Sequence, residues 1–104
     1  MELEKVKRNL QSVGQACFIR YYRELTASNL TNDQVVSLLR SETTYTEQSC
    51  VSRVSHARAI IQAGVASQAL ALVVEAKRVA PEIKQQARVY LKEIAKQNNS
   101  GRGV

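Results

Sequence analysis

Apolar residues recur along this chain at steps of three and four, the spacing of a helix with one buried face. The first such stretch runs from Glu2 to about Leu25 and predicts one long helix. Gly14 falls inside it and should weaken the helix by about 1 kcal/mol relative to alanine, unless a closely packed neighbour needs the space. The early apolar positions form one stripe, which packs on the core or, as a coiled-coil seam, on a second chain. This stripe consists of Leu3, Val6, Leu10, Val13 and Cys17.

A shorter helix is expected to begin after Thr31. Thr31 and Gln34 have the spacing of a capping box, in which each side chain accepts a hydrogen bond from a backbone N–H at the helix start. The polar run at residues 41–44 should end this helix.

A third helix follows the polar turn and has two possible caps. Thr44 with Glu47 would make a second capping box. Thr46 is the preferred cap, because Tyr45 could then pack against Cys50. The buried stripe of this helix is expected at Cys50, Val54, Ala57 and Ile61.

Two more helical patterns complete the chain. The pattern at about 65–77 is apolar on most sides and belongs in the middle of a bundle or at a subunit contact. The last helix should start at Pro81, where a missing N–H does no harm. We therefore expect an all-α fold of about five helices, a small helical bundle forming one domain over residues 1–97. A helix-turn-helix would lie at about 31–63, and a disordered tail at 98–104.

Composition and charge limit the classes of binding partner that are expected. The formal net charge is +6, which favours nucleic acid first and an acidic membrane surface second. Residues 31–64 carry three basic and three acidic side chains, so the excess charge lies elsewhere. On the last helix Lys84, Arg88, Lys92 and Lys96 stand four apart. Phosphate contact is a hypothesis for Lys84, Arg88 and Lys92, against the default of a plain solvated surface.

Several classes of protein are disfavoured. Cys17 and Cys50 lie on apolar faces and should be buried, reduced thiols rather than a disulfide or a metal site. His56 has no carboxylate one turn away, and the serines lack a base, so we expect neither an enzyme nor a cofactor. The N-terminus, MELEKVKR, is charged from its second residue, and the longest apolar run, 69–74, is far short of a membrane span. We expect a cytoplasmic protein without membrane contact.

Beside its buried stripe, the third helix carries short hydroxyls, an imidazole and one guanidinium. Such donors can meet base edges or phosphates, and no Asp or Glu occurs between Glu47 and Glu75 to repel a phosphate. A solvated helix face is the alternative interpretation. The residues predicted to contact DNA are Gln48, Ser49, Ser52, Arg53, Ser55 and His56.

The third helix also resembles a known DNA reader. Residues 49–61, SCVSRVSHARAII, are similar to the recognition helix of region four of bacterial sigma factors, T-V-x-S-R-L-x-R-A-R-x-x-L. Upstream, LTNDQVVSLL at residues 30–39 is similar to that family's L-[ST]-x-x-E-I-A-x-x-L. The resemblance covers about residues 30–62, and the family's turn is shorter and contains glycine.

The resemblance implies roles for individual residues. It places Ser49, Ser52 and Arg53 at the DNA surface, and His56 where the family often has arginine. Arg58 in this pattern can be structural, pairing back onto the domain.

Two functions from different classes follow from these patterns. The first is a small helix-turn-helix protein that binds double-stranded DNA, a transcriptional regulator expected to act as a homodimer, since one such unit makes few base contacts. The alternative is a protein-binding helical adaptor module without nucleic-acid binding. Binding of structured RNA through the basic last helix is a third, weaker possibility.

Overall fold

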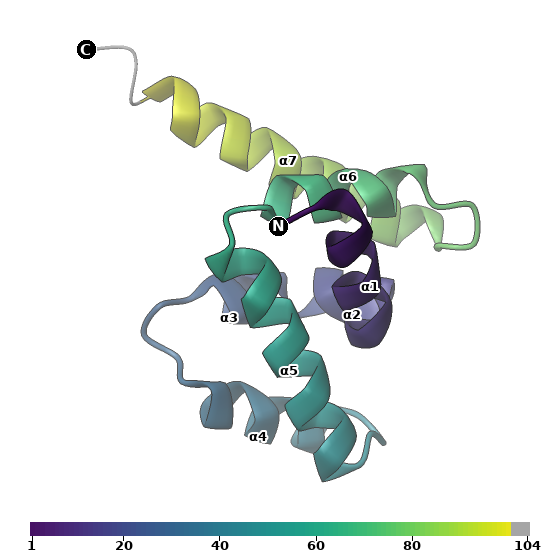
Figure 1. The fold of residues 1–104 in the computed structure, drawn as a ribbon, viewed down its shortest axis with the longest axis vertical. Coiled ribbons are helices and arrows are strands. Elements are labelled where there is room, and N and C mark those ends of the chain that lie inside the picture. The colour runs from purple at the N-terminus through teal and green to yellow at the C-terminus, as the bar shows by residue number, and fades with distance from the viewer. Residues whose placement is uncertain (101–104) are drawn as a thin grey trace.

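The computed structural model describes residues 1–100, with side chains as far as Gln97 (Figure 1). Over this part the chain forms seven helices and no strand, which confirms the all-α fold. They are α1 (Leu3–Val13), α2 (Gln15–Arg20), α3 (Tyr22–Thr26), α4 (Asn32–Glu42), α5 (Glu47–Gln62), α6 (Ala66–Glu75) and α7 (Pro81–Ser100). Because α7 continues to Ser100, only residues 101–104 of the tail predicted to be disordered lie outside the described part.

The expectation of about five helices was wrong because the first long helix is broken in two places. Gly14 has φ 89° and ψ 127°, a conformation that a residue with a Cβ rarely adopts. A Cβ built on Gly14 would stand 2.8 Å from Nη1 of Arg53, which is the close neighbour that needs the space. The second break, at Tyr21, is slighter, since the N–H groups of Tyr21 and Leu25 still donate to the carbonyls of Cys17 and Tyr21.

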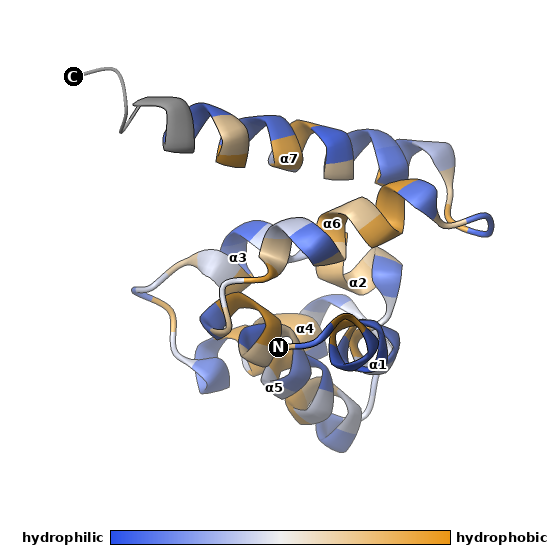
Figure 2. Cartoon of the chain, turned by 45° about the horizontal axis from the view of Figure 1, so that its top comes forward, coloured by the Kyte–Doolittle hydropathy of each residue, from blue (hydrophilic) through white to orange (hydrophobic). Residues whose placement is uncertain are grey.

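The helices are arranged in three groups along the molecule. α6 and α7 form one end, α4 and the N-terminal half of α5 form the other, and α1 to α3 lie between them (Figure 1). α5 is central, because it packs against α1, α3, α4 and α6. Figure 2 shows α6, which has several apolar residues, lying alongside α7.

The apolar stripe of α1 belongs to the core of its own chain. Val6, Leu10 and Val13 of α1 are buried, as is Cys17, which lies in α2 beyond the break at Gly14, and Leu3 is half exposed. α1 lays this stripe on α5 and α6. The homodimer stays a prediction, but this stripe gives it no support.

The structure contains the caps predicted for α4 and α5. The capping box is confirmed: the Thr31 N–H donates to Oε1 of Gln34 at 2.8 Å, and the Gln34 N–H donates to Oγ1 of Thr31 at 3.1 Å. Thr46 is the cap of α5, accepting from the Ser49 N–H at 3.1 Å.

One position of the buried stripe of α5 was wrong. Cys50, Val54 and Ala57 are buried as expected, but the fourth member is Ile60, which is 0% exposed. Ile61 is only partly buried. A step of three and a step of four both fit 3.6 residues per turn, so the spacing alone does not choose between the two isoleucines.

No single helix within residues 1–100 is long and apolar enough to cross a membrane. α5 and α6 together reach that length and composition, but they are bent by 114° at the break between them. Their apolar side chains, such as Ile60 and Leu70, are fully buried in the core.

Tyr21, which lies between α2 and α3, forms a hydrogen bond with the last residue of α4. Its hydroxyl donates to Oε1 of Glu42 at 3.0 Å. Burial, together with this hydrogen bond to a carboxylate, raises the pKa of Tyr21 from 10 to about 12.

The raised pKa of Tyr21 predicts a loss of stability in alkali. Below pH 10 the phenol is protonated in both states, whereas between pH 10 and about 12 the unfolded chain releases the proton that the folded chain keeps. The free energy of unfolding should therefore fall as the pH rises through this window. Tyr21→Phe should lose about 0.5–1.5 kcal/mol at neutral pH, with the hydrogen bond, and should fall less steeply in alkali. Urea unfolding at a series of pH values measures both effects, and equal slopes in the two proteins would contradict this account.

Candidate nucleic-acid interface

The six residues of α5 predicted to contact DNA divide into two groups. Gln48, Ser52 and Ser55 are exposed, and Val51 between them is 51% exposed. The other three, Ser49, Arg53 and His56, are partly buried and make hydrogen bonds within the chain. One half of the predicted face is therefore open to a partner, and the other half is turned toward α1.

The Arg53 side chain makes three contacts within the chain. Its Nη1 donates to the carbonyl of Val13 at 2.6 Å, and its Nε donates to Oγ of Ser49 at 3.0 Å. Its guanidinium carbon lies 3.8 Å from the centre of the Tyr45 ring, so Tyr45 supports Arg53. Val13 is the last residue of α1, and its carbonyl has no partner further along that helix. Arg53 therefore satisfies the C-terminal end of α1, where a positive charge also complements the helix dipole.

Arg58 does the same for another helix. Its Nη2 donates to the carbonyls of Glu24 at 3.3 Å and Ala27 at 3.5 Å, at the end of α3. Its Nε is buried and has no hydrogen-bond partner within the described part of the chain. Arg58 thus has a structural role, as the resemblance implied it can. Both guanidiniums of α5 donate to carbonyls at the C-terminal end of another helix.

His56 joins α5 to the middle of α1. Its Nδ1 lies 2.7 Å from Oδ1 of Asn9, and the Asn9 Nδ2 donates to the carbonyl of Lys5 at 2.9 Å. Because the amide oxygen only accepts, this pairing assigns the proton to Nδ1. The neutral ring then offers an acceptor at Nε2, and only the protonated ring could donate to a phosphate.

A hollow of about 420 Å³ opens beside His56 along the outer face of α1. Five residues of α1 line it with His56, and none of the lining residues is acidic: Lys5, Arg8, Asn9, Gln11 and Ser12. Lys5 and Arg8 are exposed cations three residues apart on one helix face. This pair was not among the predicted contact residues, because the first helix was interpreted from its apolar stripe alone. The spacing of Lys5, Arg8 and Ser12 was the signal that could have found it.

The basic stripe of α7 forms a separate surface. Arg88 and Lys92 are exposed and Lys84 is partly buried. α7 packs on α6 and α2, at the opposite end of the molecule from the N-terminal half of α5 (Figures 1 and 2). The structure does not bring these three cations together with the residues predicted on α5.

Cys17 and Cys50 are both free and buried. Burial is the main cause that raises the pKa of the Cys17 thiol, and the nearby Arg53 opposes it. Within the described residues, no group of three histidine, cysteine or carboxylate side chains could hold a metal ion.

Comparison with known proteins gives no further guide. No protein-family model, no curated protein and no solved structure matches this chain.

Proposed function

We propose that this chain is a small cytoplasmic protein that binds double-stranded DNA as a transcriptional regulator. In this proposal α4, the turn at residues 43–46 and α5 act as a helix-turn-helix, with the exposed face of α5 in a major groove. The observation that carries the proposal is this face of α5, which presents small polar side chains and no carboxylate beyond Glu47. The resemblance of residues 30–62 to region four of sigma factors supports the same assignment.

The exposed side chains of α5 suit contacts with base edges. The Gln48 amide and the hydroxyls of Ser52 and Ser55 can donate and accept, and the Val51 methyls can meet a thymine methyl. All of them are short enough for a close approach of the helix to the groove floor. The one acid nearby, Glu47, lies 3.6 Å from Nη1 of Arg40, so its charge is partly balanced.

Phosphate contacts come from α1 in this proposal. Lys5 and Arg8 line the hollow to which α5 contributes His56. Contacts of this kind fix the position of a protein on the duplex and carry no sequence information. Arg53 then keeps its structural contacts with Val13, Ser49 and Tyr45 and is not assigned to a base.

Titration with random duplex DNA at low and at moderate salt tests the proposal. Affinity should fall steeply as salt rises, because bound cations release counterions from the phosphates. The double variant Lys5→Ala/Arg8→Ala should weaken all sequences alike. It should also reduce the slope of log affinity against log salt by about one for each contact removed.

A matched control removes the same charge elsewhere. Arg88→Ala/Lys92→Ala takes two exposed cations from α7 and should leave the salt slope unchanged. If the α7 variant lost binding and the α1 variant did not, the nucleic acid would lie on α7 and the proposed interface would be wrong. Absence of binding at both salt concentrations would reject the DNA-binding proposal in favour of the protein-binding module.

A further inference from the structure

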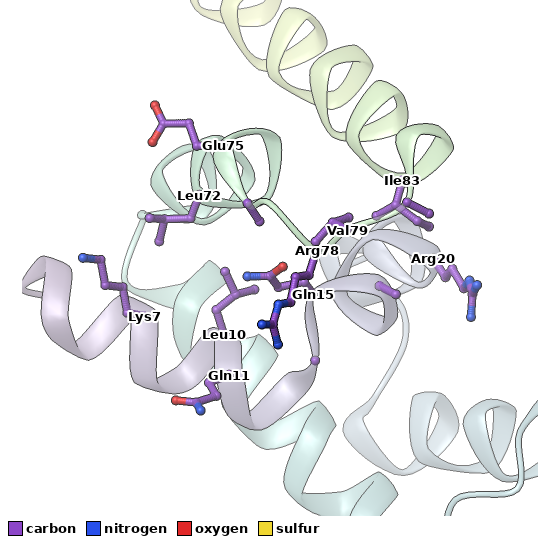
Figure 3. A pocket seen from close by; sticks show the side chains of 14 residues that line it. Lys7, Leu10, Gln11, Gln15, Arg20, Leu72, Glu75, Arg78, Val79 and Ile83 are labelled. Carbon is purple, nitrogen blue, oxygen red and sulfur yellow. The ribbon is translucent and has the colours of Figure 1, made fainter.

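A groove of about 760 Å³ runs between α1 and α2 on one side and α6 with the α6–α7 connection on the other (Figure 3). Its volume lies within the range of small-molecule sites, roughly 300–1,000 Å³. Neither the exposed face of α5 nor the Lys5 and Arg8 pair contributes to it. Gln11 is the one residue that lines both this groove and the hollow beside His56, and the other lining residues of the groove lie outside the surface proposed for DNA.

The walls of this groove are largely apolar. Leu10 contributes from α1, Leu72 from α6, and Val79 and Ile83 from the α6–α7 connection and the start of α7. Three alanines leave the space between these larger side chains open: Ala16, Ala76 and Ala80. An apolar ligand body would replace water on these surfaces, which is favourable at about 25 cal/mol per Å² removed from water.

Positive charge dominates the rim. Three cations line the groove, Lys7, Arg20 and Arg78, against the single carboxylate of Glu75. Figure 3 shows the Arg78 side chain extending across the groove toward α1, and the Glu75 carboxylate pointing away from it. A negative group on a ligand would therefore meet the guanidinium without meeting the carboxylate.

Arg78 is the cation best placed for such a contact. Lys7 is already paired with Glu4 at 3.7 Å, and the Arg20 side chain points outward in Figure 3. Within the described part of the chain, the Arg78 guanidinium has neither a hydrogen-bond nor an ion-pair partner. The Gln15 amide lines the same groove and offers a further donor.

We propose that this groove binds a small organic carboxylate with an apolar body. The carboxylate is held by Arg78 with help from Gln15, and the body lies mainly on Leu72 and Val79, two partly exposed apolar side chains of the lining. A planar guanidinium suits a carboxylate because it can donate two parallel hydrogen bonds. Of the two guanidiniums that line the groove, Arg78 extends across it and Arg20 points outward, so the groove fits one anionic head, whereas an acidic peptide would need a row of available cations.

Octanoate is a suitable probe, with octanol and octylamine as its neutral and cationic counterparts. Titrations followed by ¹H–¹⁵N NMR should show octanoate shifting the amides of the groove lining at millimolar concentration or below. Octanol should bind at least about tenfold more weakly, because it lacks the charge-assisted contact. Arg78→Ala should weaken octanoate by about the same factor.

Two further variants sharpen this test. Arg88→Ala removes an exposed cation of α7 outside the groove and should leave octanoate affinity unchanged. Ala80→Leu places a larger side chain at an exposed lining position and should weaken octanoate while Arg78 is intact. Equal binding of octanoate and octanol, shifts away from the groove, or no shifts at millimolar probe would overturn the proposal. Binding of an acidic peptide in place of octanoate would also overturn it, and none of these outcomes depends on whether the chain binds DNA.

Discussion

Arg53→Ala should lower the free energy of unfolding by about 2–4 kcal/mol, a large loss for a chain of this size. The change removes a charge-assisted hydrogen bond to the Val13 carbonyl, worth about 1.5–3 kcal/mol. It also removes the cation–π contact with Tyr45, worth about 0.5–1 kcal/mol or more. The C-terminal end of α1 then loses both its hydrogen-bond donor and the positive charge that complements its dipole. Urea unfolding at neutral pH measures the loss.

Two other arginine substitutions serve as controls for the stability loss of Arg53→Ala. Arg40→Ala removes an exposed arginine whose 3.6 Å pair with Glu47 is a surface contact, and should cost no more than about 1 kcal/mol. Arg53→Lys keeps the charge, but a lysine cannot donate to the Val13 carbonyl and to Ser49 while it also stacks on Tyr45. Its loss in free energy of unfolding should therefore lie between those of Arg40→Ala and Arg53→Ala. A loss below about 1 kcal/mol for Arg53→Ala would show that the observed contacts contribute little.

The same variant separates a structural arginine from a DNA reader. Under conditions where Arg53→Ala is folded, its affinity for random duplex DNA and its salt slope should match those of the parent chain. If Arg53 clamped a phosphate, the slope would shrink by about one. If it read a guanine, affinity for a specific site would drop by about 1–3 kcal/mol, and the preference at one position would relax.

Features that depend on residues close together in the sequence were predicted correctly. The capping box of Thr31 and Gln34, and the cap at Thr46, need only a few consecutive residues to form. The all-α fold followed from apolar spacing over longer windows, because that spacing reports which residues share a helix face. These signals are local, and so the sequence contains them explicitly.

The contacts around the candidate site could not be predicted from the sequence, because they join residues that are distant in it. Arg53 and Val13 are separated by 40 residues, and His56 and Asn9 by 47. Helical spacing showed that Ser49, Arg53 and His56 share one face, but not that α1 lies against it. The break at Gly14 depends on the same packing, since Arg53 occupies the space that a side chain there would need.

Gly14→Ala should be about as damaging as Arg53→Ala, at about 2–4 kcal/mol. The alanine would have to adopt φ 89° and ψ 127°, and a strained backbone of this kind costs about 1–3 kcal/mol. Its Cβ would also stand 2.8 Å from Nη1 of Arg53, which pushes the guanidinium off the Val13 carbonyl.

Gly64→Ala supplies the matched control, because it separates backbone strain from the clash. Gly64 also has a positive φ, 75°, but a Cβ there would meet nothing within 4 Å. Its loss should be limited to the strain of a left-handed conformation, about 1–2 kcal/mol. The difference between the two glycine variants then measures what the contact with Arg53 adds.

The double variant Gly14→Ala/Arg53→Ala tests whether the two residues act through one contact. With the guanidinium gone, the new methyl group meets no clash and has no cap to displace, so the cost of Gly14→Ala should fall toward that of Gly64→Ala. The double variant should therefore lose less stability than the two single losses added together, by about 0.5–3 kcal/mol. Strict additivity would mean that Gly14 is required for its backbone conformation alone, and that Arg53 can move aside without leaving the end of α1.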